Sequence, residues 1–189
     1  MSCLASNPKT TSCTAKSQIG GLRPTVWALN LNASDGTKLS YTKTGNTISA
    51  ITIQSGLAAY RIDGEKFAHD LASDGVKNDG GNVYYQPTLN IRSIVDTDAD
   101  ITWLDDMVKA TNLVFIVEKP NNTFLVVGQD SGLSYLSGTI NEGGQTADSN
   151  IASLLGFQGQ EINPSSLLDV GTGYEDTLNY IIGLETPAP

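Results

Sequence analysis

Two apolar blocks joined by a short polar turn constrain the fold of this chain most. Residues 113–117 (LVFIV) and 124–127 (FLVV) are wholly apolar, and a polar turn at 120–122 separates them. A strand with one face in water alternates apolar and polar residues, and these blocks do not. The sequence therefore predicts a hairpin that is covered on both faces. We expect an opposite sheet on one face and, on the other, the helix that directly precedes the hairpin.

That helix is predicted over residues 98–110. Ile101, Leu104 and Val108 follow the i, i+3, i+7 spacing of a helix, with Trp103 and Met107 beside them. The other apolar patterns indicate strands. The predicted strands cover residues 22–31, 48–54, 57–63, 66–71, 82–95, 132–140 and 152–161, and the alternation of Leu178, Tyr180 and Ile182 in the tail is also typical of a strand.

These elements predict a mainly β (α+β) fold, an antiparallel β-sandwich or barrel with one flanking α-helix. We expect an N-terminal arm at 1–20, a sandwich domain at 21–170 and a C-terminal extension at 171–189. Within the sandwich, residues 32–47 are polar and too long for an ordinary connection, so they form an extended loop or an exposed hairpin.

The longest predicted strand, residues 82–95, has two unlike faces. One face is apolar and the other is polar, as the period of two requires. The apolar face carries Val83, Tyr85, Leu89, Ile91 and Val95, and the other carries Tyr84, Gln86, Thr88, Asn90 and Arg92.

The charge balance argues against nucleic-acid binding. The net charge is −9 and the estimated pI is 4.4, whereas nucleic-acid affinity comes mainly from Lys and Arg that neutralise phosphates. No apolar run reaches the 18 residues of a membrane span, and the N-terminus lacks the apolar region of a signal peptide. We expect a cytoplasm-like compartment, in which Cys3 and Cys13 are two free thiols, with a disulfide as the alternative.

Residues able to carry catalysis or bind a metal are few. His69 alternates with Phe67 and Leu71, which favours a structural histidine over a base. Asp96, Asp98 and Asp100 match the opening of a calcium loop, but Ile101 stands where that loop needs glycine and Met107 where it needs glutamate. We interpret these acids as groups that favour a helix N-terminus. The sequence predicts neither an enzyme nor a cofactor.

Several segments together resemble a family of virion proteins. They are the strand entry IGGLRPTVWALNL (19–31), the helix ITWLDDMVKA, the hairpin NLVFIVEKPNNTFLVVGQDSGL (112–133), and the run from SGT to GFQGQEINPSSLLD (137–169). In this order they resemble the tube-type structural proteins of phages and prophages of the Bacteroidetes group, and more broadly the major tail tube proteins. The resemblance covers roughly residues 19–169.

The resemblance implies a self-assembling structural protein. Tail tube subunits form hexameric rings whose sheets join into an inner barrel, and the rings stack into a conduit for the genome. An extended loop or hairpin and the chain termini reach the neighbouring ring. The partners would be further copies of the chain and neighbouring virion proteins, while DNA passes without specific binding. The location would be the virion tail, assembled in the host cytoplasm.

Residues are assigned to these roles as expectations. The lumen candidates are Gln86, Thr88 and Asn90, although Arg92 in the same row counts against a purely acidic wall. The candidates for contacts between subunits are Asp35, Lys38, Leu39, Tyr41 and Lys43 in the 32–47 segment, with Tyr180 and Ile182 in the tail.

Other functions stay open at this point. Within the same class, the chain could be a tail terminator, a decoration protein or an injection-system tube. A monomeric β-sandwich binding module, such as a lectin or adhesin domain, is a rival from another class. The sparse aromatic residues and the missing secretion signal argue against it.

Overall fold

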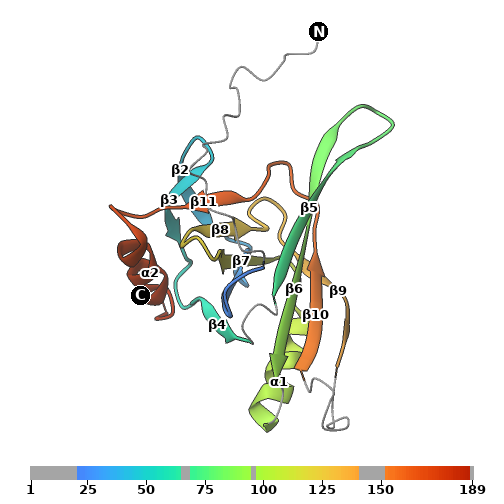
Figure 1. The fold of residues 1–189 in the computed structure, drawn as a ribbon, viewed down its shortest axis with the longest axis vertical. Coiled ribbons are helices and arrows are strands. Elements are labelled where there is room, and N and C mark those ends of the chain that lie inside the picture. Colours follow the sequence, from blue (N-terminus) through green and yellow to red (C-terminus); the bar gives the residue numbers. More distant parts are fainter. Residues whose placement is uncertain (1–20, 65–68, 95–96, 141–151, 188–189) are drawn as a thin grey trace.

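The computed structural model describes residues 21–64, 69–94, 97–140 and 152–187 (Figure 1). Within them lie eleven strands and two helices. Their bounds are β1 Thr25–Asn30, β2 Ser40–Thr44, β3 Thr47–Thr52, β4 Tyr60–Asp63, β5 Asp70–Lys77, β6 Val83–Ile94, α1 Asp98–Lys109, β7 Leu113–Glu118, β8 Phe124–Val127, β9 Ser134–Thr139, β10 Ala152–Gln158, β11 Ser166–Leu168 and α2 Tyr174–Gly183.

The strands form two sheets. One has seven strands in the order β2-β3-β11-β8-β7-β1-β4, and the other has four in the order β5-β6-β10-β9. All pairs are antiparallel except β3 with β11, which makes the larger sheet mixed. The predicted mainly β fold is confirmed, and it is an open sandwich with no closed barrel.

The apolar hairpin is β7 and β8, and its strands are covered on both faces as predicted. All six residues of β7 are buried. Leu113, Phe115 and Val117 pack in a first core cluster, which also holds residues of the four-stranded sheet and of α1. Val114 and Ile116 pack in a second core cluster on the opposite face.

The prediction that the helix before the hairpin covers its second face is wrong. Helix α1 lies on the same face as the four-stranded sheet, and its Leu104 and Met107 belong to the first core cluster. The second face is instead covered by α2, whose Ile181 is fully buried, together with Leu39 and Ala59 from connecting segments. The short connection does make α1 a neighbour of β7, but it does not decide which face the helix covers.

The prediction of a strand around Leu178, Tyr180 and Ile182 is also wrong, because residues 174–183 form α2. Tyr174, Leu178 and Ile181 follow the i, i+4, i+7 spacing of a helix, and all three pack against the second core cluster. The end of the helix is held as well, since Leu184 O accepts a hydrogen bond of 2.8 Å from Ala59 N.

Helix α1 begins at a capping box. Thr97 Oγ1 accepts from Asp100 N (3.2 Å), and the Asp100 carboxylate accepts from Thr97 N (2.9 Å). The two residues satisfy two N–H groups that a helix start leaves open. The acids therefore favour the helix start, with Thr97 as the cap itself.

Strands β5 and β6 form a long hairpin that extends beyond the rest of the sheet, at the upper right of Figure 1. The predicted strand at 66–71 is partly outside the described residues, and the observed strand continues through Lys77. A turn over residues 78–82 connects the strands, with Gly81 at a φ of 83°. The most extended hairpin is thus not the predicted 32–47 segment.

Candidate assembly surfaces

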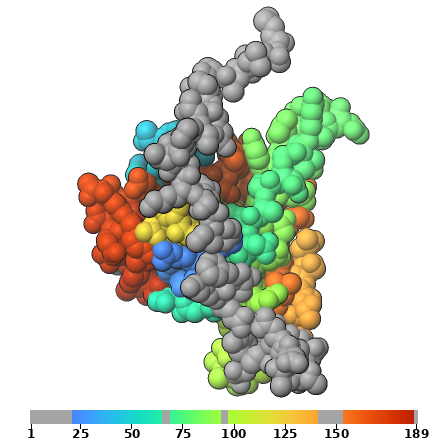
Figure 2. Space-filling view, viewed as in Figure 1, coloured from blue at the N-terminus to red at the C-terminus, as the bar shows by residue number. Residues whose placement is uncertain are grey.

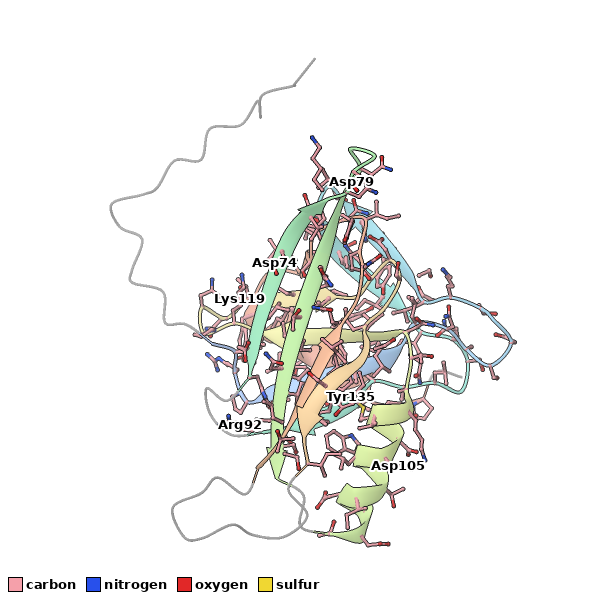
Figure 3. All side chains as sticks on the ribbon, turned by 90° about the vertical axis from the view of Figure 1, so that its right-hand side faces the viewer. Asp74, Asp79, Arg92, Asp105, Lys119 and Tyr135 are labelled. Atoms are coloured by element: carbon pink, nitrogen blue, oxygen red, sulfur yellow. The ribbon has the colours of Figure 1, made fainter. Side chains whose placement is uncertain are left out.

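The outer face of the four-stranded sheet is polar. Leu89 and Ile91 are fully buried on its inner face, and the lumen candidates Gln86, Thr88 and Asn90 lie on the opposite, outer face of β6. Figure 3 turns this sheet toward the viewer, with Asp74 and Arg92 labelled on it. The predicted alternation of faces in this strand is confirmed over the buried part of the strand.

Hydrogen bonds join the polar groups of this outer face across strands. Asn90 Nδ2 donates to Asp70 Oδ2 on β5 (3.0 Å), and Gln158 Nε2 on β10 donates to Thr88 Oγ1 (2.9 Å). These cross-strand bonds hold the side chains flat against the sheet. The face is therefore a preorganised polar wall that carries carboxylates and amides.

Along β5, one edge of this sheet presents backbone groups that no described strand pairs. Tyr85 exchanges both backbone hydrogen bonds with Glu161 on the β10 side, each 2.8 Å long. Backbone groups alternate in direction along a strand, so Tyr84 and Gln86 bond toward β5. Their partners there are Val76 and Asp74, and the intervening Ser73 and Gly75 consequently point their N–H and C=O groups away from β6. No described strand lies beyond β5.

The opposite edge, β9, is less regular. Its register with β10 shifts between Gly156 and Phe157, and Leu136 at this bulge is 57% exposed. Gly138 has no room for a side chain, because a Cβ there would lie 2.1 Å from Leu154 O. A bulge at an edge restricts which strand can pair with it.

The 32–47 segment is a turn followed by β2 and the start of β3. Asp35, Lys38 and Lys43 are exposed, and Tyr41 is half-buried. Leu39, expected at a contact between subunits, instead packs inside its own subunit, because Leu39 N donates to Leu31 O (2.8 Å) and draws the side chain into the second core cluster. Lys43 Nζ donates to Gln129 Oε1 (2.8 Å).

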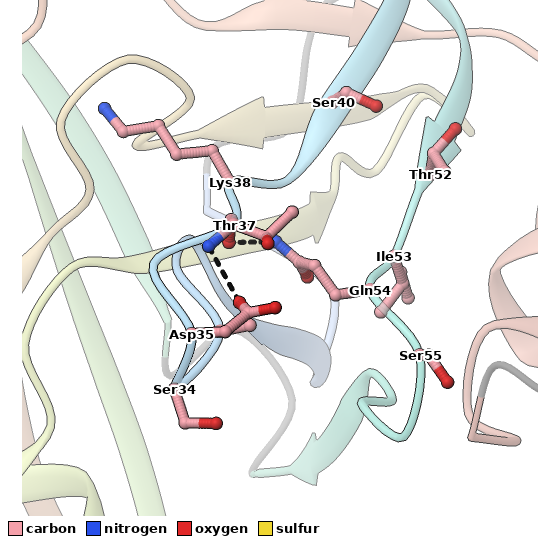
Figure 4. Close-up of a pocket in the computed structure, with 10 residues that line it drawn as sticks. Ser34, Asp35, Thr37, Lys38, Ser40, Thr52, Ile53, Gln54 and Ser55 are labelled. Atoms are coloured by element: carbon pink, nitrogen blue, oxygen red, sulfur yellow. Dashed lines mark hydrogen bonds between the residues drawn. The ribbon is translucent and has the colours of Figure 1, made fainter.

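A hollow of about 330 Å³ lies beside this turn (Figure 4). Asp35 Oδ1 accepts from Thr37 N (2.8 Å), and this bond lowers the pKa of the Asp35 carboxyl. Gln54 Nε2 donates to Thr37 O (2.9 Å) and closes the turn from the other side. The polar groups here fix the turn, and their arrangement contains no acid and base in contact.

The two tail candidates lie on α2 and differ in environment. Tyr180 Oη accepts from Ile51 N (2.7 Å) and donates to Ile51 O (2.8 Å), so it occupies the place of a neighbouring strand's peptide group at β3. Ile182 is 44% exposed. Tyr180 therefore closes an edge within the subunit, and of the two only Ile182 is available to a neighbour.

Sequence reasoning missed a buried carboxylate that joins two loops. Glu161 is 2% exposed and accepts from Asp130 N (2.6 Å), Ser131 N (3.0 Å) and Gly132 N (3.1 Å). Burial raises the pKa of the Glu161 carboxyl, and these N–H groups oppose the rise. The available signal was the pair of segments VVGQDSGL and GFQGQE, which meet here.

Glycines allow these two segments to approach each other closely. A Cβ at Gly132 would lie 2.4 Å from the Asn112 Cα, and one at Gly159 would lie 2.4 Å from Gly132 O. The backbones therefore approach closer than any side chain permits. The segments that carry the family resemblance thus make a structural joint between the two sheets.

His69 is buried and held by backbone on both sides. Nδ1 accepts from Arg92 N (3.0 Å), so the ring is neutral and Nε2 donates to Pro24 O (2.9 Å). Burial lowers the pKa of the imidazole, and the bond to Pro24 opposes this. The ring connects the start of β5 with β6 and with the segment before β1, which is a structural role.

The described calcium candidates have roles at the start of α1. Asp100 serves the capping box and Asp98 lies in the first turn of α1. Asp96, Cys3 and Cys13 lie outside the described residues. Among the residues that the structure does describe, no group of three or more His, Cys, Asp or Glu side chains is placed to hold a metal ion.

Neither helix of the described chain has the length and apolar character needed to cross a membrane. Comparison of the chain with models of protein families, with curated proteins and with solved structures found no match.

Proposed function

We propose that this chain is a structural subunit that self-assembles into rings, and that stacked rings form a phage tail tube through which DNA passes. The observation that carries the proposal is the four-stranded sheet, which combines a polar outer face with an open edge at β5. The hexameric ring and the phage context come from the family resemblance. The subunit acts by assembly, with no catalytic step.

The open edge supports lateral assembly. Strand β5 is eight residues long, contains no proline and pairs with β6 without a bulge, so its outer backbone groups can accept a further strand. Its charged side chains, Asp70, Asp74 and Lys77, would have to be matched by the strand that pairs there. A neighbouring copy could add a strand there and continue the sheet. Repeated around a ring, this pairing would join the four-stranded sheets into one barrel, with their outer faces turned to the lumen.

The polar face supports a conduit for DNA. The polar side chains of this face are mainly hydroxyls and amides. On β5 and β6 its charged side chains are two acids, Asp70 and Asp74, and one base, Arg92. Phosphates bind to Lys and Arg, so a wall poor in both lets DNA slide. The net charge of −9 acts in the same direction.

Removal of one backbone N–H from the β5 edge tests the proposed lateral assembly. Ser73→Pro removes an N–H that points away from β6, so it blocks the edge while the ladder to β6 stays intact. Ser73→Ala is the matched control, because it removes the hydroxyl and keeps the N–H. We expect rings or tubes in electron micrographs of the unmodified chain and of Ser73→Ala, and folded monomers of Ser73→Pro in light scattering and circular dichroism.

The outcomes separate the alternatives. A strict monomer at all concentrations of the unmodified chain would refute the assembly and favour a monomeric binding module. Rings that never stack would indicate a tail terminator. Rings that persist in Ser73→Pro would place the lateral contact elsewhere.

A further inference from the structure

Aspartate is followed directly by glycine at four places in this chain: Asp35–Gly36, Asp63–Gly64, Asp74–Gly75 and Asp79–Gly80. Such a pair can modify itself, because glycine has no Cβ to keep the aspartate side chain away from the glycine nitrogen. The nitrogen attacks the carboxyl carbon Cγ and closes a five-membered imide ring. This attack needs a free carboxyl, a free N–H and a backbone that can rotate. The hydrogen bonds of the fold therefore decide which pair reacts.

The first pair, Asp35–Gly36, has both reacting groups held in its turn. Gly36 N donates to Ala33 O (2.9 Å), and Asp35 Oδ1 accepts from Thr37 N (2.8 Å; Figure 4). The bond from Thr37 lowers the pKa of the Asp35 carboxyl. This favours the carboxylate form, which is a poor target for a nucleophile.

The second pair, Asp63–Gly64, is held in the same way at the end of β4. Gly64 N donates to Pro24 O (2.8 Å), and Asp63 Oδ1 accepts from Thr25 Oγ1 (2.9 Å). Arg61 Nε lies 3.0 Å from Asp63 Oδ2. Both the nucleophile and the carboxyl of this pair are therefore occupied.

The third pair, Asp74–Gly75, lies within β5. Here the N–H of Gly75 points away from β6, but the backbone of Asp74 bonds to its ladder partner Gln86. Closing the ring requires a rotation about the Cα–C bond of Asp74, which brings the next nitrogen onto the side chain. That rotation breaks the ladder, so this pair reacts only after the strand opens.

The fourth pair, Asp79–Gly80, lies at the tip of the β5–β6 hairpin. Figure 2 shows this end of the hairpin standing clear of the body, and Figure 3 labels Asp79 there. Asp79 and Gly80 are exposed, and no described residue donates to the Asp79 carboxylate or accepts from Gly80 N. The neighbours close the turn instead, since Asn78 N donates to Asn82 O (3.0 Å) and Gly81 N donates to Asn78 O (2.9 Å). The reacting groups of this pair are thus uncommitted.

We propose that Asp79 converts itself to isoaspartate and that the fold protects the other three pairs. The reaction needs only water. Gly80 N bonds to Cγ of the protonated Asp79 carboxyl, the Cγ–OH bond breaks, and the hydroxyl leaves as water with the amide proton. One water then adds to the imide and breaks the bond between the nitrogen and the original main-chain carbonyl. The product has the mass and charge of the parent, but its main chain passes through Cβ and Cγ.

The modification changes the outer end of the hairpin. The main chain of the turn gains one carbon atom, which alters the two hydrogen bonds that close it. Beyond Tyr85 the only described partner of β6 is β5, and a two-stranded ribbon is marginally stable. Tyr84 and Asn90 both bond toward β5. In the modified chain we expect amide exchange to accelerate severalfold at Tyr84 and to stay unchanged at Asn90.

Ageing of the full chain tests the site. The folded protein is incubated for several weeks in neutral buffer and then digested with trypsin, which places the four pairs on four peptides, residues 17–38, 62–66, 67–77 and 78–92. An isoaspartyl peptide keeps its mass and changes its retention time in reversed-phase chromatography, so mass spectrometry quantifies each site. Isoaspartate should form in peptide 78–92 at least about tenfold faster than in the other three, because those must open locally before they react.

Two controls separate the chemistry from the fold. In concentrated urea all four pairs lose their hydrogen bonds, so the four peptides should age at similar rates. In Gly80→Ala the new Cβ meets only Asn78 Oδ1, at 3.5 Å, so the turn accommodates it. The methyl group crowds the attacking nitrogen, so this variant should lose most of the isoaspartate in peptide 78–92 and none in the other peptides.

Each outcome decides the inference. Equal ageing of the four pairs in the folded chain, or faster ageing at Asp35, would overturn the protection by the fold. Isoaspartate at Asp79 in urea but not in the folded chain would overturn the site. Unchanged ageing in Gly80→Ala would overturn attack by the Gly80 nitrogen. None of these measurements depends on rings or on a second copy, so this inference and the proposed function fail independently.

Discussion

The two sheets of this molecule are buried to different degrees. The seven-stranded sheet has a core cluster on each face, and every residue of β7 is buried. The four-stranded sheet has one face on the first core cluster and one polar face. The difference separates two tasks, because the doubly covered sheet holds the core of the fold while the singly covered sheet leaves a polar face and the β5 edge uncovered by described residues.

One substitution in each sheet tests this difference most directly. Phe115 is fully buried on β7, and its ring centroid lies 5.0 Å from that of Phe157. Phe115→Ala should lower the free energy of unfolding by about 3–5 kcal/mol, because it leaves a cavity between the sheets. Gln86→Ala on the polar face should change it by no more than about 0.5 kcal/mol. Urea unfolding monitored by circular dichroism measures both, and equal losses would contradict the division of tasks.

The joint between the sheets is the next test. Glu161→Gln replaces one acceptor oxygen with an NH2 group that faces N–H donors of residues 130–132. We expect a loss of about 1.5–3 kcal/mol in the same unfolding experiment. The matched control is Glu175→Gln, at an exposed position of α2, and this substitution should change the free energy of unfolding very little. A neutral Glu161→Gln would mean that the carboxylate does not hold the loop.

A smaller effect is expected on the outer side of the seven-stranded sheet. Tyr180→Phe removes both hydrogen bonds to Ile51 and keeps the ring in place. The loss should be about 1 kcal/mol. Amide exchange of Ile51 should accelerate more than that of Val114 in the centre of the sheet. Equal acceleration at both amides would contradict a local role.

The smallest effect appears only as a pH dependence. The folded protein holds His69 neutral and lowers its pKa, so the unfolded chain binds more protons below its ordinary pKa of about 6.5. The free energy of unfolding should therefore fall as the pH drops from 7.5 through 6. In His69→Gln this slope should disappear, although the variant is less stable at every pH.

Other buried groups set the range of that experiment. Burial raises the pKa of the Glu118 and Glu161 carboxyls, so their contribution to stability decreases as the pH rises above about 4.5. This is the opposite direction, so the difference in slope between the unmodified chain and His69→Gln over the same pH range isolates the histidine. A slope that persists in His69→Gln would assign the effect to another group.

The sequence was sufficient for elements with one unambiguous pattern. Helix α1 and the two faces of β6 follow from one repeat each, the apolar hairpin follows from two unbroken apolar blocks, and all three are present. The tail was ambiguous, since Leu178, Tyr180 and Ile182 fit a strand while Tyr174, Leu178 and Ile181 fit a helix. Packing against the second core cluster decides for the helix, and that information is not local.

Surfaces were harder to predict than the core. The length of the polar segment 32–47 suggested an extended loop or an exposed hairpin, but Leu39 anchors it to the subunit. The hairpin that does project has polar strands around Asp74 and Lys77, and nothing in their composition reveals how far they extend. The polar row of Gln86, Thr88 and Asn90 was predicted by alternation, while the joint at Glu161 depends on loops that meet only in three dimensions.

The hydroxyl of Tyr180 has a consequence for the newly made chain. It lies 129 residues after Ile51, whose backbone groups it satisfies. At a synthesis rate of about 5–20 residues per second, β3 leaves the ribosome roughly 6–25 s before the residue that closes its edge. During that interval this part of β3 is open to any passing strand. A chain that stops before α2 would keep that edge open permanently.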